Sequence, residues 1–180
     1  GAIVAPYVLD SRKCISYLTI ELRGVIPREL RHLMGDWVFG CDICQDVCPV
    51  NWKAVPGSEP AFQKRHDFDA PELLPLLDMD DEEFRERFRN SPIKRTKLLG
   101  LQRNVCVALG NLGDDRAIPA LRKALDTDDP VVRLHAAWAL GRIGGVEAMA
   151  CLKLASAQET DAEALDEIEL SIAELESRPR

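Results

Sequence analysis

The stretch Ala108-Leu109-Gly110-Asn111-Leu112-Gly113 returns 31 positions later as Ala139-Leu140-Gly141-Arg142-Ile143-Gly144. At the same lag, Ala117, Ile118 and Leu121 return as Ala148, Met149 and Leu152. A match at one fixed lag across two segments of helical periodicity is typical of helical repeats, in which each helix pair buries its apolar side against the next pair. Residues 91–180 are therefore predicted to form a short solenoid similar to HEAT repeats, and the fold is predicted to be mainly α.

Further helices are predicted on both sides of this repeat. A stripe of four aliphatic residues predicts a last helix over roughly Asp161–Glu176, with acidic residues on its other faces. Upstream, a capping-box pattern predicts a helix over Asp81–Arg89, and Ser91-Pro92 offers a cap and a first-turn proline for the next helix. The Pro- and Gly-containing stretch Val50–Pro71 predicts a long loop, so residues 56–90 are expected to be a linker with connecting helices.

The composition suits a folded, soluble protein. The chain has 180 residues, of which 46% are hydrophobic, and a net charge of −7. Such a chain can bury a core, and no apolar run reaches the roughly 20 residues that cross a bilayer. We expect no membrane partner. The opening Gly1-Ala-Ile-Val-Ala-Pro reads like the interior of a folded domain, so the chain is expected to be a fragment.

Four of the six cysteines fall in the first 48 residues: Cys14, Cys41, Cys44 and Cys48. The other two, Cys106 and Cys151, lie in apolar helical patterns and are predicted to be small core residues. Disulfide scaffolds are usually shorter and secreted. A reducing, cytoplasmic compartment is therefore predicted.

The spacing Cys14-x26-Cys41-x2-Cys44-x3-Cys48-Pro49 indicates a metal or cluster site. Thiolates are soft ligands that suit zinc and iron–sulfur clusters. Zinc ribbons usually pair two C-x2-C knuckles, whereas this segment has one. A final cysteine followed by proline is typical of a bacterial ferredoxin run, in which that cysteine serves the second cluster. Iron–sulfur binding is favoured over zinc, and unliganded buried thiols are the remaining alternative.

The acidic chain contains one strongly basic segment. Residues 85–103 carry seven cations and one acid, a local charge of +6. The cations are Arg85, Arg87, Arg89, Lys94, Arg95, Lys97 and Arg103. Lys94, Arg95 and Lys97 follow the predicted helix start, where free backbone N–H groups suit phosphate. The segment predicts a polyanion site, and a solvated helix end is the alternative.

These motifs, in this order, resemble the C-terminal half of epoxyqueuosine reductases. The resemblance is carried by residues 6–10, 12–19 and 40–49, followed by residues 91–95 and the repeats, and it runs the whole length of the chain. In that family a cobalamin-binding domain precedes a ferredoxin-like domain with two 4Fe–4S clusters, and the enzyme reduces epoxyqueuosine in a tRNA anticodon to queuosine. The resemblance implies that residues 1–55 are a partial ferredoxin-type domain of a cytoplasmic, monomeric tRNA-modifying enzyme whose clusters receive electrons from a donor.

The resemblance also implies roles for the cysteines. Cys14, Cys41 and Cys44 would hold three corners of the cluster nearer the cobalamin, and Cys48 would reach the other cluster. The family's first C-x2-C-x2-C-x3-C-P run and its cobalamin domain are absent from this chain. Alone, the chain is expected to complete neither cluster and to be inactive.

Two further groups of residues receive roles in the same way. Ser16 and Asp42 would face the cobalamin, and Lys94, Arg95 and Lys97 would bind the tRNA backbone. Two other functions stay open: a non-enzymatic HEAT interaction module with a structural metal site, and a general ferredoxin-type electron carrier.

Overall fold

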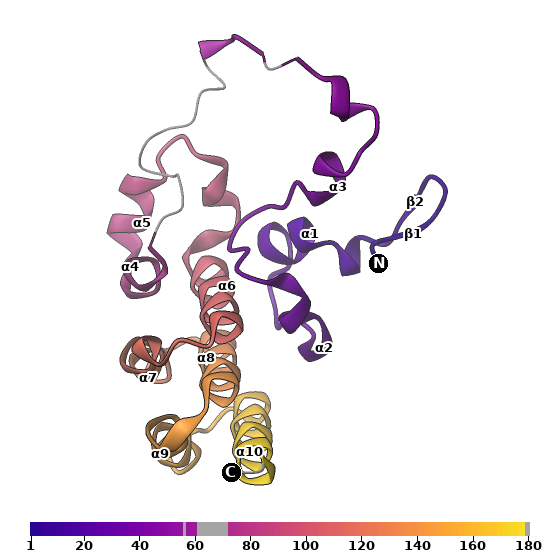
Figure 1. Cartoon of the computed structure of the whole chain (residues 1–180). Coiled ribbons are helices and arrows are strands. Elements are labelled where there is room, and N and C mark those ends of the chain that lie inside the picture. The colour runs from indigo at the N-terminus through magenta and orange to yellow at the C-terminus, as the bar shows by residue number, and fades with distance from the viewer. Residues whose placement is uncertain (56, 61–71, 179–180) are drawn as a thin grey trace.

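The computed structural model describes residues 1–55, 57–60 and 72–178. Figure 1 shows an N-terminal segment of short elements beside a stack of longer helices. The prediction of a mainly α fold is confirmed. Among the described residues, no helix is long and apolar enough to span a membrane.

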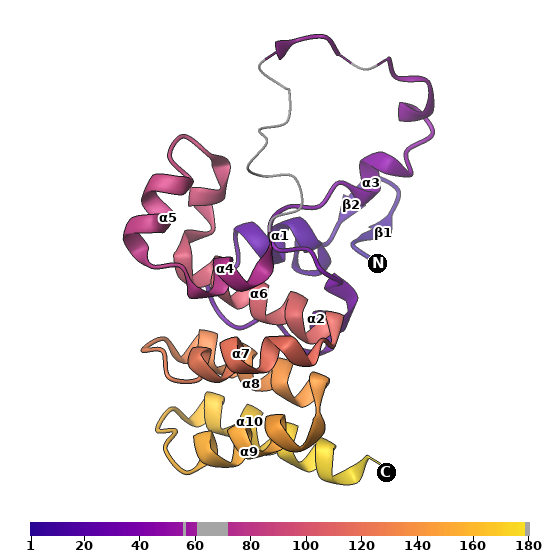
Figure 2. The ribbon, with the colours of Figure 1, turned by 60° about the vertical axis from the view of Figure 1, so that its left-hand side comes forward.

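The stack consists of α6 (Lys97–Leu112), α7 (Ile118–Ala124), α8 (Pro130–Ile143), α9 (Gly145–Ser156) and α10 (Ala162–Ser177). Helices α6, α8 and α10 pack in one layer, which we call the inner layer, and α7 and α9 flank it (Figures 1 and 2). The lag of 31 relates α6 to α8 and α7 to α9. The predicted solenoid is confirmed.

The repeated hexapeptide explains how the inner layer packs. A Cβ atom on Gly110 would lie 2.8 Å from the Cα of Ala139, and one on Gly141 would lie 2.8 Å from the Cβ of Ser171. The first glycine of each copy therefore lets the next inner helix approach closely. The last glycine of the first copy, Gly113, ends α6 with a φ of +69°, a conformation that favours glycine.

We expect Gly110→Ala to lower the free energy of unfolding by about 1 to 3 kcal/mol, because the added methyl group overpacks the α6–α8 contact. Urea denaturation of the 180-residue chain measures this loss. Gly24→Ala is the matched control, since a Cβ at Gly24 meets nothing within 4 Å. Equal losses in the two variants would show that the contact at Gly110 is not tight.

The N-terminal segment is built from short elements. They are the antiparallel hairpin β1 (Ile3–Ala5) and β2 (Val8–Leu9), then η1 (Ser11–Lys13), α1 (Ile15–Ile20), α2 (Arg28–Arg31), η2 (His32–Met34), α3 (Ile43–Asp46) and η3 (Asn51–Lys53). Three more elements lead into the solenoid: α4 (Leu73–Asp78), α5 (Asp81–Arg87) and η6 (Pro92–Arg95). The part of the predicted loop at residues 56 and 61–71 lies outside the described residues.

Two predicted helix boundaries differ from the structure. The capping box of α5 is present, but the helix ends at Arg87, two residues earlier than expected. Ser91 caps the 3-10 helix η6, and the α-helix begins only at Lys97, whose φ is +66°. The hydroxyl of the preceding residue, Thr96, donates a hydrogen bond to the Thr19 carbonyl (2.8 Å). It therefore makes no side-chain cap for α6.

The N-terminal segment lies on the opposite side of the inner layer from α4, α7 and α9 (Figure 1). On α8, His135 is fully buried, and its Nε2 accepts the backbone N–H of Ile26 (3.2 Å). Its Nδ1 therefore carries the proton and donates to the Val131 carbonyl (2.6 Å). Burial and the nearby Arg31 charge hold the pKa of His135 well below its usual value.

An ion-pair network joins α2 to α10. Arg31, 2% exposed, donates to Glu167 (2.8 Å), and Arg28 bonds both Glu167 (3.0 Å) and Glu174 (2.7 Å). The Arg31 guanidinium also lies 5.7 Å from the ring of Trp138. The segment around α2 is thus attached to α8 and α10 at once.

Candidate metal centre and RNA-binding face

The six cysteines divide into two groups, as their sequence positions predicted. All six are free thiols. Cys106 and Cys151 are buried in the solenoid, and burial raises the pKa of Cys106 to about 12. These two are core residues, as expected. The four N-terminal thiols are half-buried or exposed and therefore accessible to a ligand.

Short elements place these four thiols. Cys14 precedes α1, and its carbonyl accepts the N–H of Leu18 (2.9 Å). Cys41 follows Gly40, which has a φ of +72°, Cys44 lies within α3, and Cys48 follows that helix. Figures 1 and 2 place α1 and α3 at the same end of the molecule, away from α10.

The structure does not assemble a finished ligand set. Within residues 1–55, 57–60 and 72–178, no three His, Cys, Asp or Glu side chains are grouped closely enough to hold a metal ion. The assignment of Cys14, Cys41 and Cys44 to one cluster, and of Cys48 to another, stays a prediction. The donor chemistry fits such a cluster, because free, accessible thiols are the ligands that iron–sulfur clusters use.

The two residues predicted to face cobalamin lie beside these cysteines. Ser16 is half-buried on α1, two residues after Cys14. Asp42 is exposed at the start of α3, and its carboxylate makes no cap hydrogen bond. Both side chains are accessible, and their role also stays a prediction.

One member of the basic segment is not at the surface. Arg103 is 1% exposed and donates all five of its N–H groups, to the carbonyls of Leu18 (2.7 Å), Leu22 (2.9 Å) and Gly24 (2.8 Å) and to Oδ1 of Asn104. Burial lowers its pKa to about 10. The prediction that Arg103 contributes to a polyanion-binding surface is therefore wrong. Its guanidinium donates hydrogen bonds to backbone carbonyls at the end of α1 and just after it.

The sequence holds a signal for this arrangement. Gln102, Arg103 and Asn104 are three consecutive polar residues between Leu101 and Val105, and all five are buried. Three consecutive positions span about 200° of a helix, so they cannot all lie on one solvent-facing stripe. Such a polar triplet inside an apolar helix indicates side chains that bond buried backbone.

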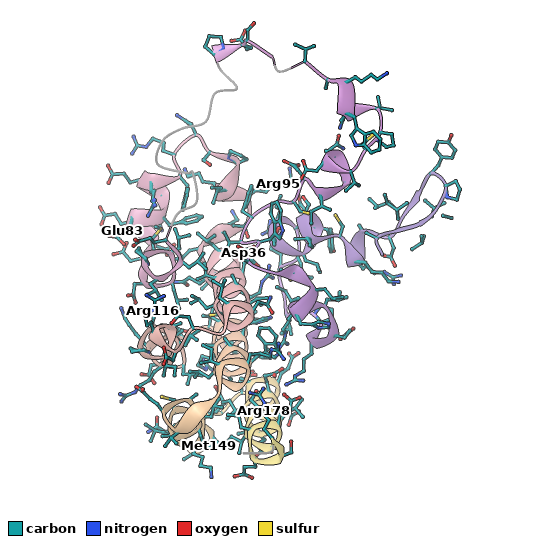
Figure 3. The ribbon with its side chains drawn as sticks, viewed as in Figure 1. Asp36, Glu83, Arg95, Arg116, Met149 and Arg178 are labelled. Atoms are coloured by element: carbon teal, nitrogen blue, oxygen red, sulfur yellow. The ribbon has the colours of Figure 1, made fainter. Side chains whose placement is uncertain are left out.

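The other basic residues remain at the surface. Lys94 and Arg95 on η6, and Lys97 at the start of α6, are exposed. Arg95 pairs with Glu21 just after α1 (2.7 Å), and Figure 3 shows Arg95 in the part of the molecule away from Arg178. Lys94 and Lys97 form no ion pair within the part of the chain that the structure describes. Their assignment to tRNA binding stays a prediction.

Sequence comparisons identify both parts of the chain. Residues 1–51 match the 4Fe-4S double cluster binding domain family, and residues 100–173 match HEAT repeats. Epoxyqueuosine reductase of Escherichia coli (strain K12) is 44% identical over 142 residues, which are 79% of this chain and 38% of that protein. The Pseudomonas aeruginosa enzyme is 46% identical over 145 residues, 80% of this chain and 40% of that protein. The chain thus spans about two fifths of these relatives.

Solved structures give the same result. A crystal structure of epoxyqueuosine reductase with an epoxyqueuosine-modified tRNA-Tyr stem loop has a TM-score of 0.91 and 36% identity, covering 98% of this chain and 47% of that one. The enzyme from Bacillus subtilis has a TM-score of 0.90 and 36% identity, covering 97% and 47%. In sequence and in fold, the chain is therefore similar to one part of epoxyqueuosine reductase, and within this chain a match to the double cluster-binding family is joined to a match to HEAT repeats.

Proposed function

We propose that the chain is the electron-transfer and tRNA-binding part of an epoxyqueuosine reductase, an oxidoreductase that converts epoxyqueuosine to queuosine in the tRNA anticodon. The observation that carries this proposal is the set of four accessible free thiols inside a segment that matches the double cluster-binding family. The close fold match to a reductase bound to a modified tRNA stem loop supports the substrate class.

In this proposal two 4Fe–4S clusters share the cysteines. Cys14, Cys41 and Cys44 supply three thiolates to one cluster, and Cys48 supplies one to the other. Each cluster needs four ligands, so the remaining thiolates come from other parts of the longer reductase. Cys106 and Cys151 are unsuited to this role because both are buried in the solenoid, where a cluster has no access to them.

Cobalamin held mainly by another domain would supply the reducing chemistry for the epoxide. Within this chain, Ser16 and Asp42 are the residues proposed to contact it, because a hydroxyl and a carboxylate can bond the amide groups of a corrin. Their place beside Cys14 and Cys41 would keep cluster and cofactor close. An electron-donor protein would reduce the clusters.

We also propose the division of the chain and its setting. Residues 1–55 form the cluster-binding segment, residues 56–90 the connection and residues 91–180 the HEAT-like domain. The protein acts as a monomer in the cytoplasm, where a reducing compartment keeps thiols available for clusters. The free state of all six cysteines supports this setting.

Metal analysis tests the iron–sulfur assignment. The longer reductase of which this chain is proposed to be a part is called the full-length protein below. When it is reconstituted anaerobically, we expect it to hold about eight irons and as many sulfides, as two 4Fe–4S clusters require. The 180-residue chain alone should hold less iron and release it readily, because it provides a three-cornered site. Stoichiometric zinc without sulfide would contradict the assignment and favour a structural metal site in an interaction module. Clusters without tRNA binding would indicate a general electron carrier.

The tRNA assignment predicts a change in salt dependence. Each phosphate contact releases counterions, so the logarithm of affinity falls with the logarithm of salt concentration by roughly 0.7 to 0.9 per contact. Replacing Lys94, Arg95 and Lys97 together by Gln should weaken tRNA binding and flatten this slope by about 2. Binding is measured with the full-length protein at several salt concentrations, with modified and unmodified anticodons. The loss should be the same for both, because backbone contacts read charge and shape.

A second triple variant separates local contacts from net charge. Arg116 on the 3-10 helix η7 (Asp115–Ala117) and Arg122 and Lys123 on α7 are exposed, and α7 lies on the other side of the inner layer from α1 and α3 (Figure 1). Replacing these three by Gln removes the same charge and should leave the slope nearly unchanged. Equal slopes in the wild type and the first variant would mean that Lys94, Arg95 and Lys97 are a solvated helix end.

A further inference from the structure

The two segments that carry the proposed ligands of one cluster are far apart in the sequence. Cys14 precedes α1, and Cys41 follows a stretch whose described elements are four residues or shorter. Local backbone structure cannot fix the separation of these two thiols. A buried set of polar side chains joins the two segments instead.

Thr19 makes the direct connection. Its side chain is fully buried on α1, and its hydroxyl donates to the Ile15 carbonyl (2.8 Å). The same oxygen accepts the backbone N–H of Gly40 (3.0 Å). One hydroxyl therefore links the helix that follows Cys14 to the residue that precedes Cys41.

Asn104 makes a second connection, from α6. It is fully buried, and its two N–H groups bond the carbonyls of Thr19 (2.8 Å) and Val38 (2.8 Å). Its Oδ1 accepts from Arg103, so the amide has both donors and its acceptor satisfied. A fully bonded amide between two backbones allows little change in their distance.

We propose that Thr19 and Asn104 are positioning residues, which set the separation and orientation of Cys14 and Cys41 and thereby the stability of the cluster that they hold. This inference rests on the proposed iron–sulfur function. Both side chains are buried and fully engaged with protein atoms, so neither is a ligand itself. Groups that orient metal ligands in this way affect metal retention and the electronic properties of the site.

An isosteric pair of variants isolates the hydroxyl. Thr19→Val keeps the shape and removes the acceptor of the Gly40 N–H, whereas Thr19→Ser keeps that acceptor. In the full-length protein with reconstituted clusters, we expect Thr19→Val to lose iron to a ferrous chelator about tenfold faster than wild type. We expect its reduced state to show a changed electron paramagnetic resonance spectrum. Thr19→Ser should restore both properties.

Two more variants complete the design. Asn104→Asp keeps the bond to Arg103 but turns an oxygen towards the carbonyls of Thr19 and Val38, so it should also accelerate iron loss. Thr127→Val removes a hydroxyl that bonds the Ala124 carbonyl (2.9 Å) in the solenoid, and should leave the cluster unchanged.

The outcomes separate this inference from the function on which it rests. Wild-type protein without iron and sulfide would overturn both. Normal wild-type clusters, combined with unchanged iron loss and spectra in Thr19→Val and Asn104→Asp, would overturn the positioning role alone. Equal effects of Thr19→Val and Thr19→Ser, or a lower melting temperature with an unchanged cluster signal, would also overturn it.

Discussion

Cys44→Ala in the full-length protein is expected to reduce epoxyqueuosine turnover by more than about a thousandfold, because alanine supplies no ligand and the electron path requires an intact cluster. Cys44 is exposed on a four-residue helix, so its replacement should not disturb the fold. Binding of tRNA should stay within a few-fold of wild type, since the thiol touches no phosphate in the proposal. Single-turnover assays and filter binding measure the two properties.

Cys151→Ala is the matched control for this experiment. It also removes one thiol, but from the buried face of α9, and should keep full iron content and turnover. Cys44→Ala protein that retains full iron and more than a tenth of wild-type turnover would show that Cys44 is not a ligand. Loss of both turnover and tRNA binding would indicate a general structural failure.

Arg103→Met is expected to lower the free energy of unfolding by roughly 3 to 5 kcal/mol, because three carbonyls and an amide oxygen lose their donors in the interior. Small domains are stable by only about 5 to 15 kcal/mol, so this loss is a large share of the total. Urea denaturation of the 180-residue chain, followed by circular dichroism, measures it. Arg103→Lys should recover part of the loss, because lysine offers three donors where arginine offers five.

Arg95→Met provides the comparison at the surface. The Arg95 side chain is 67% exposed in its pair with Glu21, and exposed pairs contribute about 0.2 to 1 kcal/mol. The two variants change the same residue type, so the difference reports the buried environment of Arg103. Similar losses would show that the hydrogen bonds of Arg103 contribute little.

Much of the fold could be predicted from the sequence because its signals are local or periodic. The lag of 31 marks the solenoid, since the same helix-to-helix contact recurs at Gly110 and Gly141. The cysteine spacing marks the cluster segment, which the family match supports. The helix caps at Asp80 and Ser91 can likewise be predicted, because each depends on only a few adjacent residues.

The rest depends on contacts between distant residues, which leave no periodic pattern. Arg103 bonds the carbonyl of Leu18, 85 positions away, whereas the sequence alone only groups it with the other cations of residues 85–103. The α-helix α6 begins later than the cap signal at Ser91-Pro92 predicts, for a related reason. The Thr96 side chain, which could have capped a helix, bonds Thr19 instead.

The attachment of the N-terminal segment to the inner layer also affects how this protein unfolds. The longest helix of residues 1–55 has six residues, and helices that short do not persist in isolation. The folded structure of this segment therefore depends on its contacts with α6, α8 and α10. A piece cut out to make a miniature ferredoxin would lose the scaffold on which its cysteine loops are folded. Residues 1–55 are therefore expected to unfold when the repeats unfold, and any cluster held by their cysteines would be lost with them.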